Sequence, residues 1–122
     1  MTPPESPVVV AALRTPIGTA GGALAGVPAA DLAAAVLAAL AVPGEPLIEV
    51  VLGNCTGPGG DVARVAALAA GLPVEVPALT VDRQCGSGLA AVALGVTMLR
   101  STSAAVLAGG VESASTAPLR SW

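Results

Sequence analysis

Hydrophobic residues along this chain form short unbroken runs that alternate with longer segments of helical pattern. The runs cover residues 8–12, 47–52, 78–81 and 104–108, and they are typical of strands that are buried on both faces of a sheet. Between these runs the sequence predicts helices over residues 28–41, 62–70 and 86–100. The order βαβαβαβ predicts an α/β fold in which a parallel-type sheet carries helices on both faces.

Local signals mark the ends of the predicted helices. Pro28 suits the first turn of the first helix, which the Pro43-Gly44 pair ends. Asp61 is placed to cap the second helix, and Gly71 is placed to close it. On the third helix the 3.6-residue period puts four apolar residues on one face: Leu89, Val92, Val96 and Leu99.

Composition restricts the class of protein. The chain has 122 residues, enough for one domain, and it is 54% hydrophobic but only 1% aromatic, so its core must consist mainly of Ala, Val and Leu. Charged residues make up 11% and the net charge is -3; the five basic residues are scattered arginines, which argues against a nucleic-acid partner. Sparse charge also predicts an exposed apolar surface of the kind that marks an interface.

The high mean hydropathy of +0.83 does not predict a membrane protein. The longest unbroken apolar run covers only residues 33–42, whereas a spanning helix needs roughly 20 apolar residues. No basic residue precedes an apolar stretch at the N-terminus, so we expect no signal peptide, a cytoplasmic location and reduced cysteines.

Cys85 is the strongest candidate for a reactive group. It lies in the elbow, residues 82–87, between the strand at 78–81 and the third helix. Unpaired N–H groups and the dipole at a helix N-terminus stabilise a thiolate, and Gly86 and Gly88 leave room for a substrate. A small buried hydrophobic residue is the alternative, and the elbow alone leaves both interpretations open.

Other polar positions carry weaker signals. Cys55 follows a strand and is interpreted as structural, because nothing near it in the sequence suggests activation. Glu112 is either a solvated loop acid or a buried acid that accepts hydrogen bonds from nearby loop backbone. The loop at 57–61 is interpreted as a turn with a helix cap rather than an anion site, because no Gly-Lys-Ser/Thr follows it. The chain has no His and no metal-ligand spacing.

Four stretches together resemble the N-terminal part of the thiolase family, the acetyl-CoA acetyltransferases and 3-ketoacyl-CoA thiolases. They extend over the chain from Pro7 to about Leu119. They are Ala-Leu-Arg-Thr-Pro-Ile-Gly at 12–18, Gly-Asn at 53–54 with Ala-Arg-Val-Ala at 63–66, the Cys85 elbow, and Ala-Gly-Gly-Val-Glu-Ser at 108–113. The sequence departs from the family at Asp82, where many members carry Asn, and in a shorter 56–61 segment.

The resemblance implies acyl transfer. Cys85 would attack the thioester of an acyl-CoA, an oxyanion would be held by the Cys85 N–H and the helix N-terminus, and Claisen condensation or thiolytic cleavage of a 3-ketoacyl-CoA would follow. Coenzyme A thioesters are the implied substrates, with no bound cofactor and no metal. The family also uses a His in a Gly-His-Pro motif and a second Cys in a Cys-x-Gly motif, and neither is present in these 122 residues.

We therefore expect a flexible leader at 1–7 and a partial, truncated thiolase N-terminal domain at 8–122 that is inactive alone. We expect it to act as a homo-oligomer or together with a complementing C-terminal thiolase segment. We expect it to bind neither nucleic acid nor a membrane. The alternative is a non-catalytic remnant or interaction module with a thiolase half-fold. A segment of a ketosynthase-like condensing enzyme is a weaker alternative, because the motifs at 14–18 and 109–113 favour a thiolase.

Overall fold

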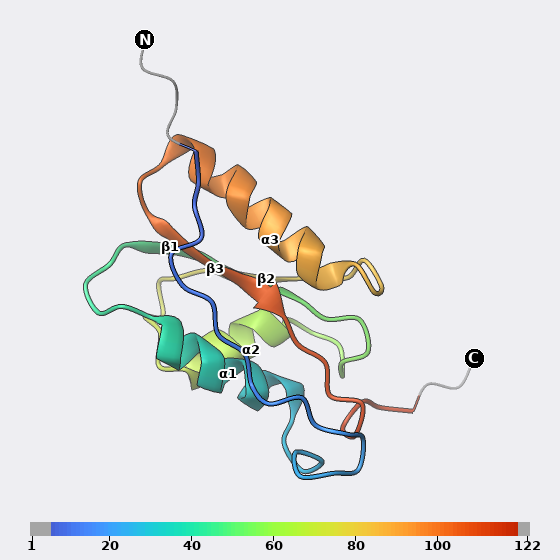
Figure 1. Ribbon diagram of the computed structural model, residues 1–122. Coiled ribbons are helices and arrows are strands. Elements are labelled where there is room, and N and C mark those ends of the chain that lie inside the picture. Colours follow the sequence, from blue (N-terminus) through green and yellow to red (C-terminus); the bar gives the residue numbers. More distant parts are fainter. Residues whose placement is uncertain (1–5, 120–122) are drawn as a thin grey trace.

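The computed structural model describes residues 6–119, and a three-stranded parallel sheet lies at its centre (Figure 1). The elements follow in the order α1 (Ala29–Leu40), β1 (Leu47–Gly53), α2 (Val62–Ala69), β2 (Ala78–Val81), α3 (Ser87–Met98), the 3₁₀ turn η1 (Leu99–Ser101) and β3 (Ala105–Gly110). The strand order is β2-β1-β3, and both pairings are parallel. The predicted α/β class with a parallel sheet is confirmed.

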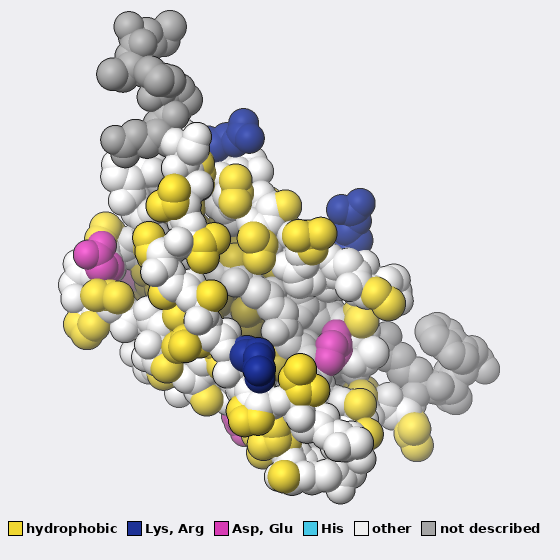
Figure 2. All heavy atoms as spheres, viewed as in Figure 1, with side chains coloured by type: hydrophobic (Ala, Val, Ile, Leu, Met, Phe, Trp, Pro, Cys, Tyr) yellow, Lys and Arg dark blue, Asp and Glu magenta, His cyan; other side chains and the backbone are white. Residues whose placement is uncertain are grey.

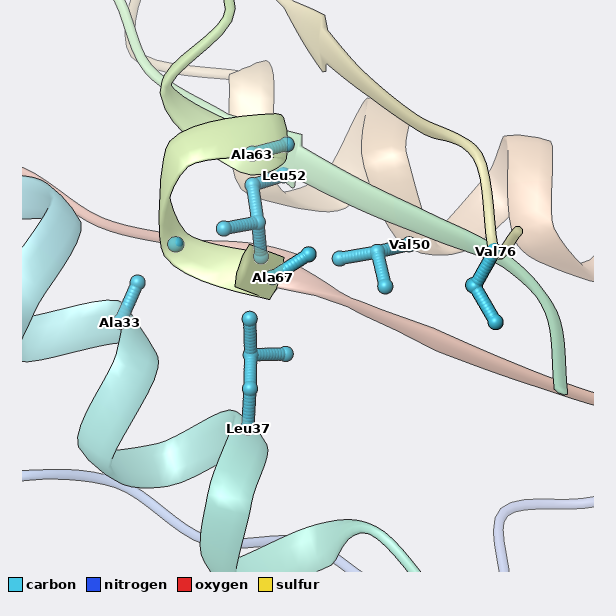
Figure 3. Packing of buried hydrophobic residues seen from close by; sticks show 8 residues of the cluster. Ala33, Leu37, Val50, Leu52, Ala63, Ala67 and Val76 are labelled. Atoms are coloured by element: carbon cyan, nitrogen blue, oxygen red, sulfur yellow. The ribbon is translucent and has the colours of Figure 1, made fainter. Parts of the chain in front are cut away.

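Helices cover both faces of the sheet, so β1 is enclosed on two sides. In Figure 1, α3 lies on one face, while α2 lies on the other with α1 packed against it. Val50 and Val51 of β1 point to opposite faces and both are fully buried. Figure 3 shows a core of small and medium aliphatic side chains from α1, α2, β1 and the loop before β2: Ala33, Leu37, Val50, Leu52, Ala63, Ala67 and Val76.

The predicted cap of α2 is confirmed, and the fold gives it a second contact. The Asp61 carboxylate accepts hydrogen bonds from the Arg64 N–H at 3.1 Å and from the Thr80 hydroxyl at 2.7 Å. Thr80 lies in β2, so the cap also ties the start of α2 to the sheet. Gly71 closes the helix with a φ of +76°, the left-handed region that suits glycine.

The residues that helix α3 buries are small. Ser87, Ala91 and Gly95 are its buried residues, whereas Leu89 is 77% exposed and Val92 and Val96 are also exposed. A Cβ at Gly95 would lie 3.1 Å from Val106 Cγ1, so the helix approaches β3 closely only because this position is a glycine. The predicted apolar stripe is therefore only partly covered among residues 6–119: Leu89, Val92 and Val96 are exposed, and Leu99, which begins η1, is half-buried.

The prediction of a strand at residues 8–12 is wrong. Residues 6–19 carry no regular secondary structure, and Val8, Val9 and Val10 are 74%, 79% and 90% exposed. An apolar run becomes a strand only where a neighbour accepts its backbone hydrogen bonds and another layer buries its side chains. Neither is provided to this segment within the described residues. Most of the leader expected at 1–7 lies outside the described residues.

Many large apolar side chains are exposed on the surface, as the sparse charge predicts. Figure 2 shows hydrophobic side chains spread over the face in view with few charged side chains between them. Across residues 6–119, none of the helices has the length and apolar character needed to cross a membrane.

Candidate active site at the carboxyl edge of the sheet

The carboxyl ends of the three strands meet at one edge of the sheet. Gly53 of β1 pairs with Val81 of β2 and with Gly110 of β3, so the strands end at the same level. Two further hydrogen bonds extend this alignment, from Asn54 N–H to the Val81 carbonyl and from Val111 N–H to the Gly53 carbonyl, both at 3.0 Å. The loops that carry Cys55, Cys85 and Glu112 therefore leave the sheet side by side, where ligands bind in open parallel sheets.

Cys85 is exposed and lies in a tight turn immediately before α3. Gly86 is the N-cap of the helix, so Cys85 precedes the cap by one residue and does not lie in the first turn. The Gly86 N–H donates to the Arg83 carbonyl at 3.0 Å, and the Ser87 N–H donates to the Gln84 carbonyl at 3.1 Å. These first donors of the helix thus hold the elbow in shape.

The Ser87 side chain holds the elbow together through two hydrogen bonds. Its buried hydroxyl donates to the Gln84 carbonyl at 2.7 Å and accepts from the Arg83 N–H at 2.8 Å. The Asp82 carboxylate accepts from the Gln84 N–H at 3.0 Å. Gln84 has a φ of +50°, in the left-handed region that side chains other than glycine rarely adopt. The turn that presents Cys85 is therefore strained at Gln84 and is held by several hydrogen bonds.

Close backbone contact fixes the elbow to the sheet. A Cβ at Gly53 would lie 2.3 Å from the Ser87 carbonyl carbon and 2.5 Å from the Gly88 nitrogen. A Cβ at Gly110 would lie 3.1 Å from Gly88 Cα. The start of α3 thus rests directly on the ends of β1 and β3, and glycine is required at the end of β1.

Glu112 accepts a set of hydrogen bonds from the loop that follows β1. The Cys55 N–H donates to Oε1 at 2.5 Å, the Thr56 N–H donates to Oε2 at 3.2 Å, and the Thr56 hydroxyl also donates to Oε2. Buried Asn54 donates from Nδ2 to the Val111 carbonyl at 2.8 Å and to Glu112 Oε2 at 3.3 Å. Each of the two interpretations left open by the sequence is right in part, because Glu112 is exposed and its carboxylate nevertheless accepts hydrogen bonds from loop backbone.

These contacts shift the pKa values of Glu112 and Cys55. Burial alone raises the pKa of Glu112, but the hydrogen bonds from Thr56 and Cys55 outweigh this effect and lower the pKa below its ordinary value. The interaction with the Glu112 carboxylate raises the pKa of the half-buried Cys55 thiol, with smaller contributions in the same direction from burial, Glu112 charge, Asp82 and Cys85. Charged groups around Cys55 therefore favour its thiol form.

Two shallow cavities flank this edge. One of about 190 Å³ has Asn54, Cys55, Thr80 and Asp82 in its lining, and one of about 240 Å³ lies between residues 15–20 and residues 110–115. Cys85 lines neither of these cavities and instead lies on the exposed surface beside them.

A family model described as "Thiolase, N-terminal domain" matches residues 7–121, nearly the whole chain. The chain belongs to this thiolase family. The match selects the thiolase interpretation of the elbow over the ketosynthase-like one. The start of α3, the elbow and the strand ends described above are thus parts of a thiolase N-terminal domain.

Curated relatives agree with this assignment. The chain is 47% identical over 118 residues to an acetyl-CoA acetyltransferase of Pseudomonas aeruginosa and 45% identical over 113 residues to a putative acetyl-CoA C-acetyltransferase of Bacillus subtilis. Each alignment covers 91% of this chain, but only 30% and 31% of the respective relative. The chain therefore spans about 30% of the length of the curated thiolases that it matches.

A solved thiolase structure has the same fold. The crystal structure of the Bacillus anthracis acetyl-CoA acetyltransferase superposes with a TM-score of 0.87 at 39% identity. The superposition covers 94% of this chain and 31% of that one. The described α/β unit is thus the N-terminal portion of a thiolase fold.

Sequence reasoning located the elbow but missed the residues that hold it. Ser87 reads as part of a small-residue stretch, and its two-sided hydrogen bonding follows only from the turn geometry. The sequence places Asn54 in a motif but indicates no role for it, and it leaves two roles open for Glu112. The available signal is a polar residue within two positions of each strand end (Asn54, Asp82 and Glu112), because the ends of parallel strands meet at one edge.

Proposed function

We propose that this chain supplies the nucleophile Cys85 for acyl transfer from an acyl-CoA, as the N-terminal part of a thiolase-type enzyme. The observation that carries the proposal is the exposed Cys85 in a constrained turn between β2 and α3, within a domain that belongs to the thiolase family. The matched relatives are named for acetyl-CoA acetyltransferase and β-ketoadipyl-CoA thiolase activity.

In the proposed step the Cys85 thiolate attacks the carbonyl carbon of the acyl-CoA thioester. The carbonyl π electrons move to oxygen and form an oxyanion, which then collapses and expels the coenzyme A thiolate. The products are an acyl-Cys85 thioester and coenzyme A. The Cys85 N–H is the donor proposed for the oxyanion, because the Gly86 and Ser87 N–H groups already donate to the Arg83 and Gln84 carbonyls. The proton leaving Cys85 needs a base, and this chain contains no His.

Complete turnover, whether Claisen condensation or thiolysis, is therefore proposed only for a site completed by other sequence. General acid–base groups each contribute on the order of 100-fold to 10,000-fold, so the chain alone should turn over negligibly. We propose that a second copy or a C-terminal thiolase segment covers the apolar face of α3 at Leu89, Val92 and Val96. The exposure of these three side chains in an otherwise ordinary helix supports that partner.

The test of the nucleophile is acyl capture on the intact chain. We expect incubation with acetyl-CoA to add the mass of one acetyl group slowly, and peptide mapping to place it on Cys85. The Cys85→Ser variant should remain unmodified, while the matched Cys55→Ser variant should be acetylated as the parent is. Acetylation that persists in Cys85→Ser and is lost in Cys55→Ser would reverse the assignment.

A non-catalytic interaction module is the second candidate, and the exposed apolar surface is the observation that favours it. The two candidates differ in one measurement. A module that only binds a partner would stay unacetylated at Cys85 both alone and after mixing with a C-terminal thiolase segment. Acetoacetyl-CoA formation that appears on mixing and is lost in Cys85→Ser would establish the enzyme piece instead.

A further inference from the structure

Cys55 and Cys85 leave the same edge of the sheet, yet a nucleophilic role is proposed for only one of them. Asn54 N–H is hydrogen-bonded to the Val81 carbonyl, so the loops that carry the two thiols start from adjacent strand ends. Cys55 is half-buried and not sealed off from solvent. Two free thiols beside one acyl-CoA site would compete for the acyl group unless something separates their reactivity.

The Glu112 carboxylate is held against the Cys55 loop by contacts that do not depend on the thiol. The N–H groups of Cys55 and Thr56 and the hydroxyl of Thr56 all donate to it, and Asn54 donates from the other side. Because two of these donors are backbone groups, the carboxylate stays beside residue 55 whatever the side chain there does.

We infer that Glu112 is a positioning residue that keeps the Cys55 thiol protonated and unreactive, so that an acyl group is accepted by Cys85 alone. The inference deepens the proposed function and rests on it for its biological meaning. The physical reason is that a thiolate is the nucleophile, and a fixed negative charge beside a thiol opposes its ionisation.

The remaining charged and ionisable groups that act on Cys55 do not offset this effect. Asp82 of the elbow and the Cys85 thiol both act in the same direction as Glu112. No Arg among residues 6–119 contributes to the pKa shift of Cys55. The interaction with Glu112 is the largest cause of the raised pKa of Cys55, which makes Glu112 the residue to remove.

The decisive experiment measures Cys55 alone, in the 122-residue chain carrying Cys85→Ser. The rate of iodoacetamide modification at Cys55 is followed by peptide mass spectrometry as a function of pH, with and without Glu112→Gln. We expect Glu112→Gln to move the midpoint of the profile to lower pH, and each unit of that shift to raise the rate at neutral pH by about tenfold. An unchanged midpoint would overturn the inference.

A matched variant separates charge from loosening of the loop. Thr56→Val removes one donor to the carboxylate but leaves the negative charge in place. We expect it to change the plateau rate at most, with the midpoint unmoved. A shift as large in Thr56→Val as in Glu112→Gln would mean that loop mobility controls Cys55, which contradicts the inference.

One further variant and one further measurement test the role of Glu112 independently. Asp82→Asn removes a smaller contribution to the pKa of Cys55 at an exposed position, so it should shift the midpoint in the same direction but by less. If Glu112→Gln does not fold, Asp82→Asn becomes the test, and an unchanged midpoint in that variant would overturn the inference. With Cys85 intact, Glu112→Gln should become acetylated at Cys55 as well when given acetyl-CoA. A chain that shows the midpoint shift but never acetylates Cys85 would contradict the proposed function and leave the role of Glu112 standing.

Discussion

The two cysteine loops of this domain start from neighbouring strands and are built in opposite ways. The elbow around Cys85 is closed by its own residues, since Asp82, Ser87 and the Gly86 N–H all bond within four residues of their partners. The loop around Cys55 is held by Glu112, 57 residues further along the chain. One thiol is presented by local geometry, and the other is restrained by a long-range contact.

The two thiols also differ in their exposure and in the groups that surround them. Cys85 is exposed in the turn that precedes α3, one residue before the helix cap. Cys55 is half-buried beside a carboxylate that favours its protonated form. Two cysteines at neighbouring strand ends therefore have different surroundings, because the fold brings a carboxylate to one loop and leaves the other thiol exposed.

Among the variants that disturb the elbow, Gly53→Ala is expected to lower the free energy of unfolding most. The new Cβ would meet backbone atoms of Ser87 and Gly88, which cannot rotate away, so the start of α3 would have to leave the sheet. We expect a loss of about 3 kcal/mol in the free energy of unfolding, measured by urea denaturation, together with loss of acyl capture at Cys85. Gly109→Ala is the matched control in β3, because a Cβ there meets nothing within 4 Å. Equal stability of the two variants would show that the close contact is not required.

Ser87→Ala tests the elbow without touching the sheet. The change leaves the Arg83 N–H without its acceptor and the Gln84 carbonyl without one donor. Loss of a typical hydrogen bond costs about 0.5–1.5 kcal/mol, and we expect the unfolding midpoint to fall accordingly. Alkylation of Cys85 should change while that of Cys55 stays the same. Ser103→Ala, at an exposed position, serves as the control and should match the parent.

The Cys55 loop should be sensitive to acid through Glu112. Its lowered pKa means that the ionised form stabilises the folded state above the ordinary value of 4.5, and that this contribution is lost as the pH falls through the lowered pKa. Glu112→Gln should therefore lower stability at neutral pH and flatten the acid limb of a plot of urea midpoint against pH. An acid limb identical to that of the parent would contradict the assignment of these hydrogen bonds to a carboxylate.

Glu49 in β1 provides a control of opposite sign. Burial, and then Asp61, raises its pKa, so its contribution to stability is present at low pH and is lost as the pH rises through the raised pKa. Glu49→Gln should increase stability at neutral pH and change little in acid. Observing the same sign for both glutamate variants would show that side-chain size, not ionisation, governs them.

The smallest expected effect is at Gln84, the strained residue of the elbow. A left-handed conformation costs an ordinary residue roughly 1–2 kcal/mol, while glycine adds about 0.5–1 kcal/mol of unfolded-state entropy. Gln84→Gly should therefore raise the free energy of unfolding by about 0.5 kcal/mol, whereas Gln84→Ala keeps the strain and should not. Thermal unfolding of the pair measures the difference, and a less stable Gln84→Gly variant would mean that the Gln84 side chain contributes more than its strain costs.

The sequence predicted the elements whose signals are local. The strands at β1 and β2, the Asp61 cap and the end of α2 at Gly71 follow from apolar runs and from residues with strong conformational preferences. The elbow was also predictable, because a strand, a polar turn and a small-residue helix start occupy adjacent positions. The strand expected at 8–12 was not formed, because an apolar run carries no information about whether a partner strand is available.

The sequence by itself determined the α/β class, the parallel strands and the placement of Cys85 at a strand-to-helix turn, since backbone preferences and hydrophobic period act over a few residues. Only the tertiary structure decided which face of α3 meets the sheet, that Gly53 must lack a side chain, and that Glu112 binds the loop of Cys55. Those features depend on contacts between residues tens of positions apart, and such contacts exist only once the strand ends have been brought to one edge.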